Sequence, residues 1–180
     1  TADDSVYFDA KGTFGGGACS DPNSPYRAWY TFTHYPDAYH CWWGFRSLPE
    51  VREMEPSYMA FVGKVLAQYA QLGITSWRLD VADELPDPFI ANIRKRLEKF
   101  PDKVLLGEVW EDASNKISYG VRRQYILGDH LQGVMNYPLR NAAIELLNES
   151  KRPEAVAYAL TQLYENYPHD IFYNNLIFEC

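Results

Sequence analysis

The sequence predicts an α/β fold in which parallel strands alternate with helices and form part of a (β/α)8 barrel. Three apolar runs have the length and bulk of strands in a parallel sheet, and polar side chains stand at or near their ends. The residues Asp80, Glu108 and Tyr137 are separated by 28 and 29 positions, which is the repeat of one strand and its helix in such a barrel. In this fold, the active-site residues lie at the carboxyl ends of the strands. The runs cover residues 74–79, 104–110 and 131–137.

A helix is predicted between the first two runs, in residues 88–100. Its apolar residues recur at helical spacing and define one face. A strand-helix-strand unit places its two strands parallel and usually side by side, about 5 Å apart. Asp80 and Glu108 are therefore expected to project from the same carboxyl edge of the sheet. The apolar face consists of Phe89, Ile90, Ile93, Leu97 and Phe100.

The residues at the first strand end indicate chemistry. An unpaired charge inside a buried strand is energetically unfavourable, so Arg78 and Asp80 are expected to pair. Taken alone, such a pair is explained equally well by an ordinary ion pair at a strand end and by an ionised carboxylate prepared for catalysis. Glu108 supplies a second carboxyl. Two carboxyls about 5 Å apart suit a retaining glycosidase, in which one is the nucleophile and the other the acid/base.

The other segments are predicted from local patterns. The first 54 residues are rich in Gly, Pro and aromatic side chains and have no helical period, which is typical of turns and short strands. A helix begins at Pro56 and stops before Gly73. The polar connection after Trp110 is expected to contain one short helix, and two longer helices follow. These three helices are expected at residues 121–126, 138–149 and 153–167.

Composition excludes several function classes. The chain has 180 residues and a formal net charge of −7, so it lacks the basic surface that binding to nucleic acid requires. No apolar run approaches the length of a membrane-spanning helix. The cysteines lack metal-ligand spacing and are expected to be free thiols, and the histidines are expected at the surface or in loops rather than as ligands. No metal site is predicted. These residues are Cys19, Cys41, Cys180, His34, His40, His130 and His169.

Two of the strand ends resemble the motifs of a known enzyme family. Residues 77–84, Trp-Arg-Leu-Asp-Val-Ala-Asp-Glu, resemble the second motif of the α-amylase family, glycoside hydrolase family 13. Residues 106–110, Leu-Gly-Glu-Val-Trp, resemble its third motif. Within the family, the sequence is most similar to the neopullulanase, cyclomaltodextrinase and maltogenic amylase group. The resemblance covers nearly the whole chain and rests on these two motifs.

The resemblance implies a role for each site residue. Asp80 would be the nucleophile and Glu108 the acid/base, and Arg78 would keep Asp80 ionised. A desolvated setting beside Trp110 would raise the pKa of Glu108. Trp110 and Glu84 would line the acceptor side of the cleft. The residues expected to bind substrate are Arg78, Glu84, Trp110, Trp43 and Tyr137.

The resemblance also implies a division of the chain. Residues 1–54 would form a domain-B-like segment that walls one side of the active-site cleft. Residues 55–180 would form a partial barrel of about strands 4 to 6 with their helices. In the first segment, Trp42 and Trp43 would point in different directions along an extended backbone, and Trp43 is the one expected to face the cleft.

The implied activity is hydrolysis or transglycosylation of α-1,4-linked glucans, with α-1,6 linkages also open, in starch-derived oligosaccharides, pullulan or cyclodextrins. No cofactor is expected, and calcium stays open for the full-length parent. The family's third carboxylate belongs to a motif outside these residues, so we expect an internal fragment of the catalytic domain. Alone, it should be inactive and should self-associate as a homodimer through open sheet edges. A non-catalytic carbohydrate-binding or assembly module stays open as the alternative. A cytoplasmic, bacterial location is expected rather than secretion.

Overall fold

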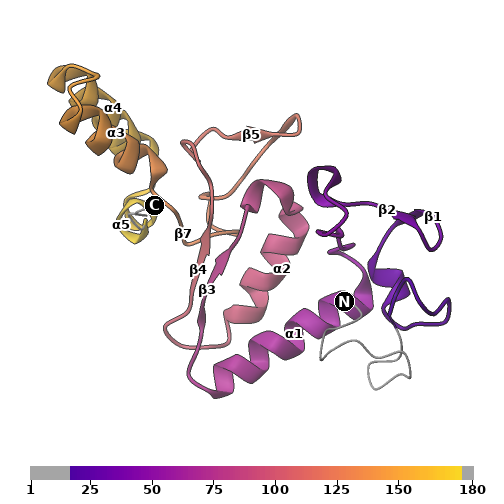
Figure 1. Cartoon of the computed structure of the whole chain (residues 1–180). Coiled ribbons are helices and arrows are strands. Elements are labelled where there is room, and N and C mark those ends of the chain that lie inside the picture. Colours follow the sequence, from indigo (N-terminus) through magenta and orange to yellow (C-terminus); the bar gives the residue numbers. More distant parts are fainter. Residues whose placement is uncertain (1–16, 176–180) are drawn as a thin grey trace. The chain divides into compact units, whose positions relative to one another are not determined.

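The computed structural model describes residues 17–175, and the chain divides into two compact units. The first unit ends at Val62 and the second begins at Gly63, so the division falls within helix α1, Pro56–Gln71. Figure 1 shows the elements of both units. The division of roles expected after residue 54, between a cleft wall and a partial barrel, stays a prediction.

From residue 17 to the start of α1, the first unit consists of turns and short strands, as its composition predicted. Strands β1 and β2 pair as an antiparallel hairpin. Trp29 packs edge-on against Tyr26 and Tyr58, with ring centroids 5.0 and 5.1 Å away, and its indole N–H donates to Ser57 Oγ at 2.8 Å. The start of α1 is therefore part of this unit's aromatic core. The elements are η1 (Arg27–Trp29), β1 (Phe32–His34), β2 (Ala38–Tyr39) and η2 (Trp42–Gly44).

The expectation that Trp42 and Trp43 point in different directions is wrong. Trp43 has a φ of 49°, inside the short 3-10 turn η2, so the backbone is not extended at this position. The left-handed conformation brings the two indole rings into parallel stacking, with centroids 4.6 Å apart and an interplanar angle of 9°. Trp43 remains 61% exposed.

The second unit is built on a three-stranded parallel sheet, which confirms the predicted α/β class. Its strands are β3 (Ser76–Leu79), β4 (Val104–Gly107) and β7 (Gly133–Val134), in the order β3-β4-β7. Ser76 lies opposite Val104 and Leu79 opposite Gly107, so the register reproduces the 28-residue spacing read from the sequence. Figure 1 shows β3 and β4 side by side, joined through helix α2.

The helices of the second unit lie close to their predicted positions. The predicted face of α2 is buried at Phe89, Ile90, Ile93 and Leu97. α5 was not predicted. Among the described residues, no helix is long and apolar enough to span a membrane. The elements are η3 (Ala82–Glu84), α2 (Asp87–Leu97), α3 (Tyr137–Leu147), α4 (Pro153–Asn166) and α5 (His169–Asn174).

The short helix predicted at 121–126 is wrong. That segment contains β6 (Val121–Arg122), which pairs antiparallel with β5 (Ile117–Ser118) in a tight hairpin. The two turn residues, Tyr119 and Gly120, have φ values of 51° and 76°. A two-residue loop with positive φ at both positions matches the right-handed twist of a hairpin, so local turn geometry overrides the weak helical pattern.

Burial differs between the two outer strands of the sheet. The predicted run 74–79 is not buried, because β3 is an edge strand whose residues alternate between half-buried and exposed, and Ile74 is 46% exposed. At β7, Asn175 Oδ1 accepts from the Val134 N–H at 3.0 Å. A Cβ on Gly133 would lie 2.8 Å from the Asn174 carbonyl oxygen. The expectation that both sheet edges are open is therefore wrong for β7, because the end of α5 covers it.

Candidate active site

Asp80 and Glu108 leave neighbouring parallel strands at the same edge, as predicted. The register pairs Leu79 with Gly107, so the two acidic residues are the next position on each strand. Backbone pairing continues past the strands, because the Glu108 N–H donates to the Leu79 carbonyl at 2.9 Å and the Ala82 N–H donates to the Glu108 carbonyl at 3.0 Å. The backbone thus fixes where both side chains begin.

One guanidinium connects the two carboxylates. Arg78 Nη1 lies 2.6 Å from Asp80 Oδ1, and Nη2 lies 3.1 Å from Glu108 Oε2. Its Nε donates to the sulfur of Met135 at 3.0 Å. Burial acts to lower the pKa of Arg78, but the hydrogen bond to Asp80 and the charge of Glu108 outweigh burial and raise it. The predicted pairing of Arg78 and Asp80 is confirmed, and Arg78 also pairs with Glu108.

The Glu108 carboxylate is surrounded by donors, while its side chain is only 10% exposed. Oε1 accepts from the Trp110 indole N–H at 3.0 Å and from the Tyr137 hydroxyl at 3.3 Å. Oε2 accepts from the Val81 N–H at 2.8 Å, in addition to its contact with Arg78.

The expectation that the pKa of Glu108 is raised is wrong. Burial acts to raise this pKa, but the hydrogen bonds from Trp110 and Val81, the charge of Arg78 and a hydrogen bond with Asp80 outweigh burial and lower it. The error has a simple cause. Trp110 was treated as an apolar neighbour, whereas it turns its N–H toward the carboxylate and stabilises the charged form.

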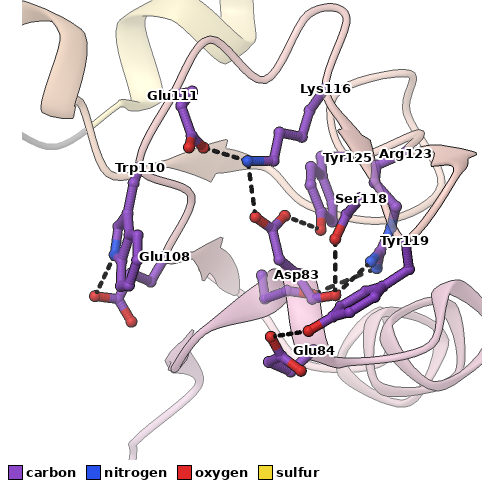
Figure 2. Close-up of polar contacts among 11 residues, drawn as sticks. Asp83, Glu84, Glu108, Trp110, Glu111, Lys116, Ser118, Tyr119, Arg123 and Tyr125 are labelled. Carbon is purple, nitrogen blue, oxygen red and sulfur yellow. Dashed lines mark hydrogen bonds and ion pairs between the residues drawn. The ribbon is translucent and has the colours of Figure 1, made fainter. Parts of the chain in front are cut away.

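The turn after β3 carries the other acidic residue of interest. Val81 has a φ of 41° and a ψ of 63°, and the 3-10 turn η3 follows it. Glu84, the last residue of that turn, accepts from the Tyr119 hydroxyl at 2.6 Å. Figure 2 shows this contact and places Glu84 on the hairpin side of the turn. The β5-β6 hairpin thus reaches the segment that begins at Asp80.

A polar network that the sequence did not reveal holds the hairpin on this turn (Figure 2). Asp83 Oδ1 accepts from the Tyr125 hydroxyl at 2.7 Å, and Oδ2 pairs with Lys116 Nζ at 3.0 Å. Lys116 also pairs with Glu111. Arg123 contacts several groups of the same turn. These residues were missed because the connection was read as a polar segment with a helix. A Tyr-Gly pair between Ile117 and Val121 was the available hairpin signal.

The other predicted site residues fall in two groups. Arg78, Glu84, Trp110 and Tyr137 lie in the second unit. Arg78, Trp110 and Tyr137 each contact Asp80 or Glu108, and Glu84, in the turn after Asp80, accepts from Tyr119. Trp43 lies in the first unit. Its predicted place in the cleft stays a prediction.

Within residues 17–175, no group of three or more His, Cys, Asp or Glu side chains could hold a metal ion. Cys19 and Cys41 are free thiols, and Cys180 lies outside the described residues. His130 is in a loop, as expected, but is buried.

Comparison with known proteins agrees with these features. No family model matches the sequence. The chain is 31% identical to an amylopullulanase of Thermoanaerobacter thermohydrosulfuricus over 215 aligned residues, covering 98% of this chain and 14% of that protein. It is 31% identical to neopullulanase 2 of Thermoactinomyces vulgaris over 99 residues, covering 54% of this chain and 15% of that protein.

The fold has close solved counterparts. A cyclic α-maltosyl-(1→6)-maltose hydrolase from Arthrobacter globiformis, solved with maltose, superposes with a TM-score of 0.75 at 22% identity, over 86% of this chain and 35% of that one. The chain therefore belongs to the α-amylase family, glycoside hydrolase family 13. It spans about one seventh of the length of the two curated relatives.

Proposed function

We propose that this chain supplies the nucleophile and the acid/base of a retaining α-glucan hydrolase. The observation that supports the proposal is the pair of carboxylates, Asp80 and Glu108, on neighbouring parallel strands and bridged by one guanidinium. Two carboxyls at neighbouring strand ends suit a double-displacement mechanism, in which one is the nucleophile and the other the acid/base. The names of the relatives favour α-1,4 and α-1,6 linkages in pullulan and maltose-containing oligosaccharides. The three parallel strands would then be about strands 4 to 6 of a (β/α)8 barrel.

The mechanism assigns one job to each carboxyl. An oxygen of Asp80 attacks the anomeric carbon while the bond from that carbon to the leaving oxygen breaks, and Glu108 gives its proton to that oxygen. Water then attacks the same carbon, Glu108 accepts a proton from the water, and the bond to Asp80 breaks. Arg78 pairs with Asp80 at 2.6 Å and holds its carboxylate in place. Trp110, Glu84 and Tyr137 would contact the acceptor side of the sugar.

The environment of Glu108 adds an expectation about pH. Its pKa is lowered in this structure, chiefly because the Trp110 and Val81 hydrogen bonds and the Arg78 charge outweigh burial. The acid form needed for the first step is therefore lost at a lower pH than for an unperturbed glutamate. We expect activity on the acidic side of neutrality, and kcat measured across pH tests this.

The deciding experiment uses the full-length protein with starch, pullulan and a cyclodextrin as substrates. We expect release of new reducing ends with retention of the anomeric configuration. Asp80→Asn should abolish turnover and leave oligosaccharide binding within about tenfold, because a carboxamide keeps the shape but is a far poorer nucleophile. Asp129→Asn, an exposed aspartate, is the matched control and should be fully active.

Two results would contradict the proposal. An inverted product would rule out a covalent intermediate on Asp80. Saturable oligosaccharide binding without turnover on any of the three substrates would favour the carbohydrate-binding module instead.

We also propose that the 180-residue chain alone is inactive and self-associates. The edge strand β3 supports this proposal, together with the exposed apolar side chains beside it, Leu72 at 71% and Ile74 at 46%. An unpaired strand edge is a template for pairing with another copy. Light scattering at micromolar concentration should give a mass above the 20.8 kDa of one chain. A monodisperse monomer would refute the association.

A further inference from the structure

Arg123 lies outside the carboxylate pair and is a buried arginine, with only 6% of its surface exposed. Its side chain contacts the segment that follows β3. The guanidinium donates to three backbone carbonyls and to one carboxylate. The contacts are Nη1 to Asp83 O at 2.8 Å, Nη2 to Leu85 O at 2.5 Å and to Ala82 O at 3.4 Å, and Nε to Asp87 Oδ1 at 2.8 Å. Figure 2 shows Arg123 reaching this turn from the hairpin.

The residue before that turn has a costly backbone conformation. Val81 is β-branched and has a φ of 41° and a ψ of 63°, in the left-handed region that such side chains avoid. Conformations of this kind persist only where the surroundings hold them in place. At Val81 this conformation accompanies a contact with the site, because the backbone N–H of Val81 donates to Glu108 Oε2 at 2.8 Å.

We propose that Arg123 is a positioning residue for the acid/base. It fixes the carbonyls of residues 82–85, and through them it holds Val81 in the left-handed conformation that places a backbone donor on the Glu108 carboxylate. This inference rests on the proposed function, because it assigns Arg123 to the same site. Arg123 touches neither carboxylate of the pair and acts through the turn.

An arginine suits this task better than a lysine. Its planar fork presents five donors in a fixed geometry, whereas an ammonium group is a point charge that meets fewer acceptors at once. Arg123 is itself held in place, because its backbone N–H donates to the Lys116 carbonyl at 2.8 Å. Its guanidinium lies 4.7 Å from the ring centroid of Tyr125, which is fully buried. These two interactions hold the Arg123 side chain in position to contact the turn.

The consequence for Glu108 is a change in its proton affinity. The Val81 hydrogen bond is one of the interactions that lower the pKa of Glu108. If the turn loosens, this donor is lost and the pKa of Glu108 rises. The groups that face the Glu108 carboxylate are Arg78 from β3, Asp80 and Val81 after β3, Trp110 after β4 and Tyr137 at the start of α3.

The test compares Arg123→Lys with Arg122→Lys in the full-length protein, at a temperature where both variants are folded. Arg122 is the adjacent, exposed arginine of β6. Arg123→Lys should lower kcat by roughly tenfold to a hundredfold, the scale of a small displacement of a catalytic group, while KM stays within about threefold. The basic limb of its pH profile should move to higher pH. Arg122→Lys should match the parent in all three measurements.

A second variant separates positioning from general stability. Glycine adopts positive φ without cost, so Val81→Gly should restore part of the lost kcat in the Arg123→Lys background. If Arg123→Lys does not fold, Asp87→Asn replaces it. That change keeps an acceptor oxygen but removes the negative charge that pairs with Arg123, and it should shift the same limb in the same direction by less. A lower melting temperature with unchanged kcat and unchanged pH profile would overturn the inference.

A measurement without turnover separates this inference from the proposed function. Carboxyl titration of Glu108 by carbon-13 NMR, assigned through Glu108→Gln, reports its pKa in the full-length protein whether or not glucans are hydrolysed. We expect a higher pKa in Arg123→Lys than in the parent. An equal pKa would refute the positioning role, whereas an inactive parent that shows the shift would refute only the proposed function.

Discussion

The carboxyl ends of β3 and β4 place two acidic residues side by side in very different surroundings. Asp80 follows β3 and its side chain is 75% exposed, whereas Glu108 follows β4 and is 10% exposed. Glu108 receives hydrogen bonds from Trp110, Tyr137 and Val81 as well as the charge of Arg78. Two carboxyls at one sheet edge can therefore be assigned different jobs by their environments alone.

The difference follows from the order of the strands. β4 is the central strand, so segments on both sides of it bring donors to its end: the turn after β3, and Tyr137 at the start of α3 after β7. β3 is an edge strand, and Asp80 is reached by Arg78 from its own strand and by Glu108 after β4. Position in the sheet thus decides how many neighbours each carboxyl meets.

The largest expected effect separates the two carboxyls by their chemistry. Glu108→Gln should lower kcat on a glucan by about 10² to 10⁴, the usual contribution of a general acid, but much less on a substrate with a nitrophenyl leaving group, which departs without a proton. Asp80→Asn should be equally inactive on both substrates, because the attack itself is lost. Steady-state rates on the two substrates test the assignment. An equal loss on both in Glu108→Gln would contradict it.

The next largest effect is expected at Arg78, which contacts both carboxylates. A lysine in Arg78→Lys can reach one carboxylate at a time, so either Asp80 or Glu108 loses its charge partner. We expect kcat to fall by roughly a hundredfold, the scale of a misplaced catalytic group, with KM changing less. Arg122→Lys is the matched control. A rise in KM alone, with kcat preserved, would show that Arg78 binds substrate rather than aligning the carboxyls.

The sequence predicted the strand ends better than it predicted their surroundings. The spacing between Asp80 and Glu108 gave the correct neighbours and register, because a strand and its crossover helix have a nearly fixed length. The predicted direction of the pKa shift of Glu108 was wrong. The shift depends on the orientation of the Trp110 indole N–H and of the Val81 backbone N–H, which the sequence does not reveal.

The contacts of the β5-β6 hairpin with the turn after β3 could not be predicted from the sequence either. Arg123, Lys116 and Tyr125 contact the segment after β3 from 33 to 42 positions away, and no periodic pattern predicts such pairs. The exposed β3 also escaped prediction, because a bulky apolar strand looks the same at a sheet edge as at its centre.

A smaller effect concerns one donor at the β4 end. Trp110→Phe keeps an aromatic ring but removes the N–H that donates to Glu108 Oε1 at 3.0 Å. Because this hydrogen bond lowers the pKa of Glu108, its loss should raise that pKa and move the basic limb of the kcat profile to higher pH. In a Glu108→Gln background the same substitution should leave the limb unchanged. A shift that persists there would mean that another group controls the limb.

The smallest expected effect comes from Tyr137→Phe, at the start of α3, which follows β7. The Tyr137 hydroxyl donates to the same oxygen of Glu108 as Trp110 does, but at 3.3 Å, which is near the upper limit for a hydrogen bond. Its loss should therefore raise the pKa of Glu108 in the same direction as Trp110→Phe but by less, and change kcat by no more than about fivefold, since a long hydrogen bond contributes about 1 kcal/mol. Tyr173→Phe, an exposed tyrosine of α5, is the control and should change neither quantity. Carboxyl titration of Glu108 in the three proteins gives the order directly. If Tyr137→Phe shifts the pKa more than Trp110→Phe does, the distances do not rank the donors, and the account of Glu108 as a carboxylate set by its nearest hydrogen bonds fails.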